Sequence, residues 1–122
     1  MTDTGRITME SYRGVLYCEA YMDDEFTVVD LDAMRAEIRS HYQGRSDVIL
    51  KKAGNYSVTL DAQRILQSGI NEFRHFVYVV DHKVKRASAE FAANSYMQPY
   101  RTQIANSQEQ AFAFLQTIAH ED

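Results

Sequence analysis

Six basic side chains fall into two short groups, each placed directly after an apolar run. The groups are Lys51 and Lys52 after residues 48–50, and His82, Lys83, Lys85 and Arg86 after residues 76–80. If both runs are parallel strands of one sheet, their carboxyl ends share an edge, and ligands favour that edge. Cations at the start of a helix are locally unfavourable unless an anion compensates. The spacing indicates a candidate site for a phosphate, a carboxylate or an acidic protein surface; side chains extended into water are the simpler alternative.

Other catalytic and metal-binding patterns find little support in the sequence. Cys18 falls on a small, apolar strand face, so a buried core residue is a better interpretation than a nucleophile. The histidines are scattered, with no pair four residues apart. Asp23, Asp24 and Glu25 lack the spacing of a calcium loop, which favours a solvated turn. We therefore expect no metal and no cofactor, and the interpretation leans away from an enzyme.

Length and composition indicate one ordinary globular domain over residues 1–122. Apolar residues make up 45% and charged residues 25% of the chain, and the net charge is −4. That charge argues against a nucleic-acid binder that relies on bulk positive charge. A single cysteine excludes an intramolecular disulfide, and there is neither a membrane-length apolar run nor a signal-peptide pattern. A reduced, cytoplasmic location is expected.

The apolar periodicity predicts the elements that position these residues. Alternation over 7–10 and 15–22, broken by Arg13 and Gly14, predicts a β-hairpin. Further strands are expected at 48–50, 76–80 and 100–105. Helices are expected over 31–42, capped by Asp30, and over 60–70, capped by Ser57 or Thr59.

Two further helices complete the predicted order. One is capped by Asp81 and carries Val84, Ala87 and Phe91 inward. The other is apolar over 111–118 and begins with a capping box of Ser107 and Gln110. The order β-β-α-β-α-β-α-β-α predicts an α/β protein with a single mixed sheet, in which an N-terminal antiparallel hairpin is followed by repeated β-α units.

This order, in a chain of this length, resembles the SpoIIAA-like fold of STAS domains. The matching stretches are Gly54-Asn55-Tyr56-Ser57-Val58 leading into Asp61-Ala62-Gln63-Arg64, Phe76-Val77-Tyr78-Val79-Val80, Pro99-Tyr100-Arg101-Thr102-Gln103-Ile104, Ser107-Gln108-Glu109-Gln110-Ala111 and Phe114-Leu115. STAS domains occur in anti-sigma-factor antagonists and at the cytoplasmic ends of sulfate transporters. The resemblance is closest to small, uncharacterised bacterial proteins of this fold, so it implies a fold rather than an activity.

The same resemblance directs attention to Ser57 and Thr59. Anti-sigma-factor antagonists carry a phosphorylatable serine or threonine where the loop after a central strand enters the next helix. Ser57 and Thr59 lie at roughly that place, but the acidic residue and the following glycine of the family's motif are missing. Helix caps or turn formers are therefore the favoured interpretation of both hydroxyls.

The sequence is compatible with two functions of different classes. The first is a non-enzymatic regulatory or protein-interaction module, as the resemblance implies, with a regulatory protein partner or a homodimer as compatible partners. The alternative is a binder of an anionic or amphipathic, lipid-like metabolite held at the cationic edge. Neither interpretation involves nucleic acid or an integral membrane segment.

Overall fold

The computed structural model describes the backbone of residues 1–121 and the side chains of residues 1–118. There, six strands form a mixed sheet in the order β1-β2-β3-β5-β7-β8, and two short strands form a separate parallel pair, β4-β6. The strands are β1 (Thr2–Asp3), β2 (Ile7–Tyr12), β3 (Val15–Ala20), β4 (Glu25–Phe26), β5 (Ser46–Lys52), β6 (Ser57–Val58), β7 (Phe73–Val79) and β8 (Arg101–Ala105). The helices are α1 (Val28–His41), α2 (Leu60–Gln67), α3 (Lys83–Ala93) and α4 (Gln108–Glu121). The predicted order of the main elements is confirmed, and the two-residue strands β1, β4 and β6 were not expected.

The N-terminal hairpin forms as predicted. Arg13 and Gly14 connect β2 to β3 with φ of 54° and 76°, so both residues of the turn lie in the left-handed region, which suits a tight hairpin. β2 and β3 pair antiparallel, whereas β3-β5, β5-β7 and β7-β8 pair in parallel. The carboxyl ends of β3, β5, β7 and β8 consequently share one edge of the sheet.

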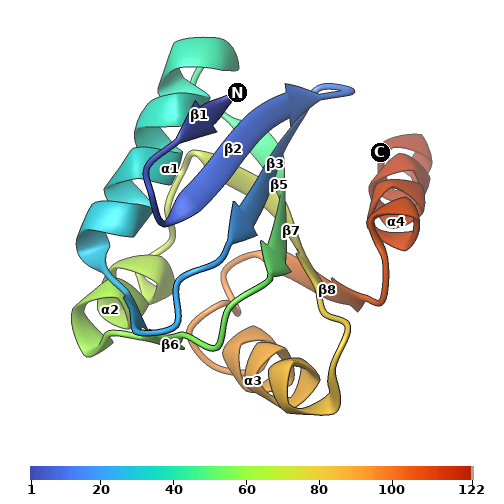
Figure 1. Cartoon of the computed structure of the whole chain (residues 1–122). Helices are drawn as coiled ribbons and strands as arrows, with labels where there is room; N and C mark the ends of the chain where they lie inside the picture. Colours follow the sequence, from blue (N-terminus) through green and yellow to red (C-terminus); the bar gives the residue numbers. More distant parts are fainter. Residues whose placement is uncertain (122) are drawn as a thin grey trace.

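Helices cover both faces of the sheet, as Figure 1 shows. α1, α2 and α3 pack on one face over the larger apolar core, and α4 packs on the other face over a smaller one. Cys18 lies in the larger core and is completely buried, as predicted. Within the described part of the chain, none of the helices combines the length and apolarity needed to span a membrane.

Side-chain caps fix where three of the helices begin. Thr27 caps α1 and forms a capping box with Asp30, so Asp30 lies inside the helix rather than at the predicted cap position. Thr59 caps α2, and its hydroxyl accepts a hydrogen bond from the amide of Ala62. Ser107 accepts from the backbone amide of Gln110 at the start of α4, as predicted, but the Gln110 side-chain oxygen accepts from the amide of Asn106 rather than from that of Ser107.

The prediction for α3 was wrong in its cap and in its inward face. His82, not Asp81, caps the helix, because its Nδ1 accepts from the amide of Val84. Val84 is 69% exposed and Phe91 65% exposed, and Ala87 is exposed too.

The buried side chains of α3 are small, and its neighbours explain why. Ala89 and Ala92 face the larger core, which also contains the bulkier Tyr78, Tyr96 and Met97. Small side chains let a helix approach such residues closely, and here the larger apolar residues of the helix lie on its outer face.

Candidate functional site

The structure separates the six predicted basic residues by the face of the sheet on which they lie. Successive side chains of a strand point to opposite faces. Lys52 follows Val48 and Leu50 toward the face covered by α3, whereas Lys51 follows Ile49 toward the face covered by α4. The two neighbouring lysines therefore do not contribute to one site. His82, Lys83, Lys85 and Arg86 all lie at the first turn of α3.

A cleft of about 300 Å³ lies between the end of β5 and the start of α3. One wall is formed by Lys52 and residues 54–56, and the other by residues 82, 84, 85 and 88. Its volume is at the lower end of the range typical of small-molecule sites, roughly 300–1,000 Å³. The cleft thus brings together Lys52, His82 and Lys85 from the two predicted groups.

Lys52 is the most unusual residue of this cleft. Its side chain is only 5% exposed, and its Nζ lies 3.9 Å from the centroid of the Tyr56 ring and 5.7 Å from that of Tyr78. Among the described residues no carboxylate forms an ion pair with it. Burial, and to a smaller extent the nearby Lys85 ammonium, lowers the pKa of Lys52 to about 8.

Lys85 and His82 supply the opposite wall. The Lys85 Nζ donates to the Ala53 carbonyl oxygen at 2.9 Å and lies 3.7 Å from Asp81 Oδ1, so this lysine ties α3 to the loop after β5. His82 caps the helix at the mouth of the cleft. The free amides and dipole at a helix N-terminus attract negative charge. Two lysines and a helix terminus therefore converge on one cleft.

The other two basic residues of the α3 group, Lys83 and Arg86, line a neighbouring hollow. Lys83 and Arg86 lie on the side of His82 that faces Asn106, in a hollow of about 340 Å³. Arg86 donates to the Asn106 side-chain oxygen at 2.9 Å and pairs with Glu90 at 3.3 Å. Its charge is already compensated within the protein, unlike that of Lys52.

The loop that carries Gly54 and Tyr56 is held in place by the loop before α1. The amides of Ala53 and Gly54 both donate to the Ala20 carbonyl oxygen at 3.0 Å. The Asn55 amide donates to Asp23 Oδ1 at 3.0 Å, and the β4-β6 pair continues the contact. The cleft wall is thus built on the segment 20–26. The acidic residues in that segment are structural as well as solvated, which the sequence did not indicate.

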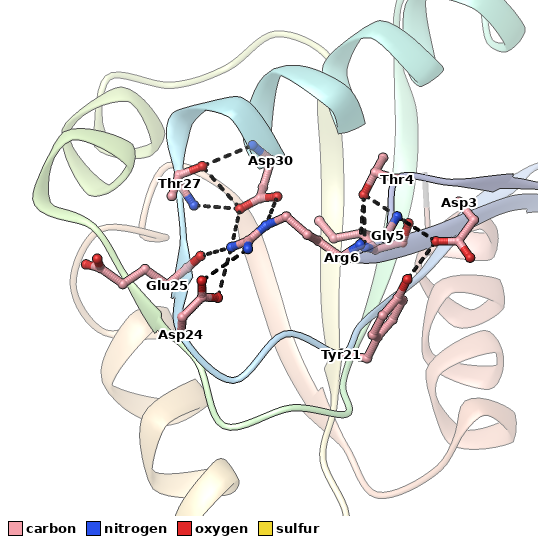
Figure 2. Close-up of polar contacts among 10 residues, drawn as sticks. Asp3, Thr4, Gly5, Arg6, Tyr21, Asp24, Glu25, Thr27 and Asp30 are labelled. Carbon is pink, nitrogen blue, oxygen red and sulfur yellow. Dashed lines mark hydrogen bonds and ion pairs between the residues drawn. The ribbon is translucent and has the colours of Figure 1, made fainter.

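Arg6 in turn holds the segment 20–26, as Figure 2 shows. Its guanidinium donates to Asp24 at 3.1 and 3.2 Å, to Asp30 at 2.9 and 3.3 Å, and to the Glu25 carbonyl oxygen. Hydrogen bonds from Arg6 are the main reason that the pKa of Asp24 is lowered, and Asp30 is buried. Arg6 therefore connects β2, the acidic loop and the start of α1.

The two candidate phosphorylation residues differ in their environment. Thr59 is half-buried and caps α2, which is the structural role that the sequence favoured for it. Ser57 is exposed in β6, and its amide donates to the Asp24 carbonyl oxygen at 3.2 Å. Ser57 thus belongs to the β4-β6 connection rather than to a helix cap.

Three other features of the described residues bear on ligand, metal and thiol chemistry. An apolar cavity between the sheet and α1 has a volume of only about 20 Å³, which is room for a single water molecule. Among the described residues no three His, Cys, Asp or Glu side chains are grouped so as to hold a metal ion. Burial raises the pKa of the Cys18 thiol well above its ordinary value, which disfavours the reactive thiolate.

In the described part of the chain, a mixed sheet with three helices on one face and one on the other defines the structural class, and a comparison with solved structures gives that class a name. The chain is similar to an uncharacterized protein of the DUF3478 family with a SpoIIAA-like fold from Shewanella loihica PV-4. The TM-score is 0.59 and the sequence identity 14%, over 89% of this chain and 91% of the other. No protein-family model and no curated protein sequence matches the chain. The chain therefore has a SpoIIAA-like fold, as its sequence predicted.

Proposed function

We propose that this protein is a binding module for a small anionic ligand, which it holds in the cleft between β5 and α3. The observation that carries the proposal is the buried ammonium of Lys52, which no carboxylate compensates among the described residues. The Tyr56 ring offsets part of this charge by a cation–π contact, but a buried charge without an anionic partner is still costly. An anion in the cleft offsets that cost.

The surroundings of Lys52 favour a compact anion such as a phosphate or a carboxylate. Lys85 and the N-terminus of α3 add positive potential from the opposite wall. Val84 adds an apolar contact at the mouth. The interior cavity of about 20 Å³ has no room for an acyl chain, so the anionic form of the ligand is favoured over a lipid-like one.

Titration with inorganic phosphate, followed by amide NMR shifts and by calorimetry, tests this proposal. We expect shifts centred on residues 52–56 and 82–88, with affinity that falls as salt is added. Lys52→Gln should weaken binding by about tenfold or more, the loss typical of one charge-assisted hydrogen bond. Lys51→Gln is the matched control, because it removes the same charge on the opposite face. Equal effects of the two variants, or no shifts in the cleft, would overturn the proposal.

The second candidate is the protein-interaction module expected from the sequence. It is favoured by the outer face of α3, where Val84 and Phe91 are exposed although both are large and apolar. A second copy of the chain is the first occupant to test. Analytical ultracentrifugation should show a dimer that Phe91→Ser weakens. A monomer at every concentration would count against self-association.

A further inference from the structure

Lys52 differs chemically from the other amines of the chain. The protein has four lysines, Lys51, Lys52, Lys83 and Lys85. Lys52 is the one whose amine is buried against aromatic rings while its side chain still lines a cleft. Lys85 is held by the Ala53 carbonyl oxygen and by Asp81. Lys83 is exposed.

The position of Lys52 also suits a nucleophile in those molecules whose Lys52 amine is neutral. Lysines become nucleophilic when they are desolvated or lie next to another cation, and both conditions hold here. Burial and the neighbouring Lys85 give Lys52 a pKa of about 8, so near pH 8 roughly half of the molecules carry the free amine. Tyr56, Tyr78 and Lys85 face this amine, and no described carboxylate does.

We propose that Lys52 captures a small carbonyl compound that also bears a carboxylate, such as a 2-oxo acid, by forming a reversible imine within the cleft. The inference rests on the anion site proposed above, because the carboxylate would be held by Lys85 and the N-terminus of α3 while the carbonyl carbon meets the Lys52 amine. The ligand class assigned to the cleft therefore carries both a carboxylate and a reactive carbonyl group.

The chemistry requires no oxidant and no cofactor. The lone pair of the neutral Lys52 amine attacks the carbonyl carbon, and the C–N bond forms as the C=O π bond opens. The oxygen takes a proton from solvent, while the nitrogen loses one, which gives a carbinolamine. The carbinolamine hydroxyl takes a further proton from solvent and leaves as water while the nitrogen lone pair forms the C=N bond, which gives a protonated imine; addition of water and loss of that proton reverse the step. The buried, aromatic side of Lys52 limits the water that reaches the imine.

The inference is tested with glyoxylate and sodium cyanoborohydride on the full chain. The hydride traps the imine as a secondary amine, and peptide mapping by mass spectrometry then assigns the modified residue. At pH 7 we expect labelling of Lys52 to be at least tenfold faster than that of Lys51 or Lys83, because a pKa of about 8 leaves roughly a tenth of the Lys52 amine free, a far larger fraction than in an ordinary lysine. The Lys52 rate should rise through pH 8 and level off, and inorganic phosphate should slow it.

Controls separate this inference from the anion proposal. Lys52→Arg should abolish the label, and Lys51→Arg should leave the Lys52 label unchanged. The comparison among lysines within the native protein needs no variant, so it remains decisive if Lys52→Arg does not fold. Phosphate binding without preferential labelling of Lys52 would overturn the imine and leave the anion site standing. If phosphate neither binds to the protein nor slows the labelling of Lys52, the proposed anion site is overturned.

Discussion

Gly54 passes so close to Met22 that a Cβ atom on Gly54 would lie 1.9 Å from the Met22 carbonyl oxygen. The crossing joins the loop after β5 to the loop before α1, and it places Asn55 and Tyr56 in the cleft wall. No side chain can be accommodated there unless the two backbones separate. The glycine is therefore required by close approach of the backbone rather than by a positive φ.

Replacing Gly54 by alanine should therefore destabilise the protein and distort the cleft. We expect a loss of about 1–3 kcal/mol in the free energy of unfolding, the range typical of overpacking. Urea denaturation measures the loss, and phosphate binding should weaken in the same variant. Gly14→Asn is the control, because Gly14 has open space around it and asparagine tolerates a positive φ. A Gly54→Ala variant as stable as the parent would contradict the geometry.

Arg6→Gln should lower the urea midpoint more than Arg64→Gln does. Arg6 bonds to Asp24, Asp30 and the Glu25 carbonyl oxygen, whereas Arg64 makes an exposed contact of 3.7 Å to Asp61. The pKa of Asp24 is lowered in the folded state, so its contribution is present above the ordinary pKa of 3.8 and is lost as the pH falls through the lowered value. The free energy of unfolding should therefore fall less steeply on acidification in Arg6→Gln than in the parent protein. Equal midpoints for the two variants would show that Arg6 does not hold the loop.

Two buried tyrosine hydroxyls should respond oppositely to removal. The Tyr100 hydroxyl donates to the Leu66 carbonyl oxygen at 2.7 Å and accepts from the Ile70 amide at 2.8 Å. Tyr100→Phe leaves the buried Ile70 amide without this partner, whereas the Leu66 carbonyl oxygen still accepts from the Gly69 amide at 3.1 Å, and the unpaired amide should cost about 1–3 kcal/mol. The Tyr56 hydroxyl has no hydrogen-bond partner among the described residues, so Tyr56→Phe should leave stability unchanged or slightly higher. Thermal and urea unfolding of both variants check this; similar losses would mean that Tyr56 does have a partner in solution.

Lys52→Met should stabilise the ligand-free protein at pH 7, and its advantage should shrink at higher pH. The pKa of Lys52 falls from 10.5 to about 8 on folding. Between these values the unfolded chain binds more protons, so the stability of the parent rises with pH while Lys52 becomes neutral. The difference between parent and variant should therefore narrow from pH 8 to pH 10.5. Lys83→Met, at an exposed position, should show no such trend, and a constant Lys52→Met effect would contradict the burial of a charge.

Local patterns in the sequence were sufficient for most of the fold. The Arg13-Gly14 turn, the β-branched and aromatic run of β7 and the Ser107 cap each specify structure within a few residues. The face of α3 was not predictable in this way. Its periodicity fits either orientation, and the choice depends on Tyr78, Tyr96 and Met97, which reach it from other elements.

The candidate site was only partly readable from the sequence. Strand ends indicated where cations gather, but a run of two lysines did not reveal that alternation sends Lys51 and Lys52 to opposite faces. The structural roles of Gly54 and Arg6 could not be predicted from neighbouring residues in the sequence. Gly54 approaches Met22 only in the folded chain, and the same is true of Arg6 and Asp30.

The strand order of the sheet has a consequence for how the molecule is made. Along the main sheet, β1-β2-β3-β5-β7-β8 is also the order in the chain, so each new strand joins the edge left by the one before it. No later strand has to be inserted between two that have already paired. During synthesis the sheet can grow in one direction as the chain leaves the ribosome. The lysine at the end of β5 then meets Tyr78 only after β7 has docked, and the cleft beside it is complete only when α3 has formed.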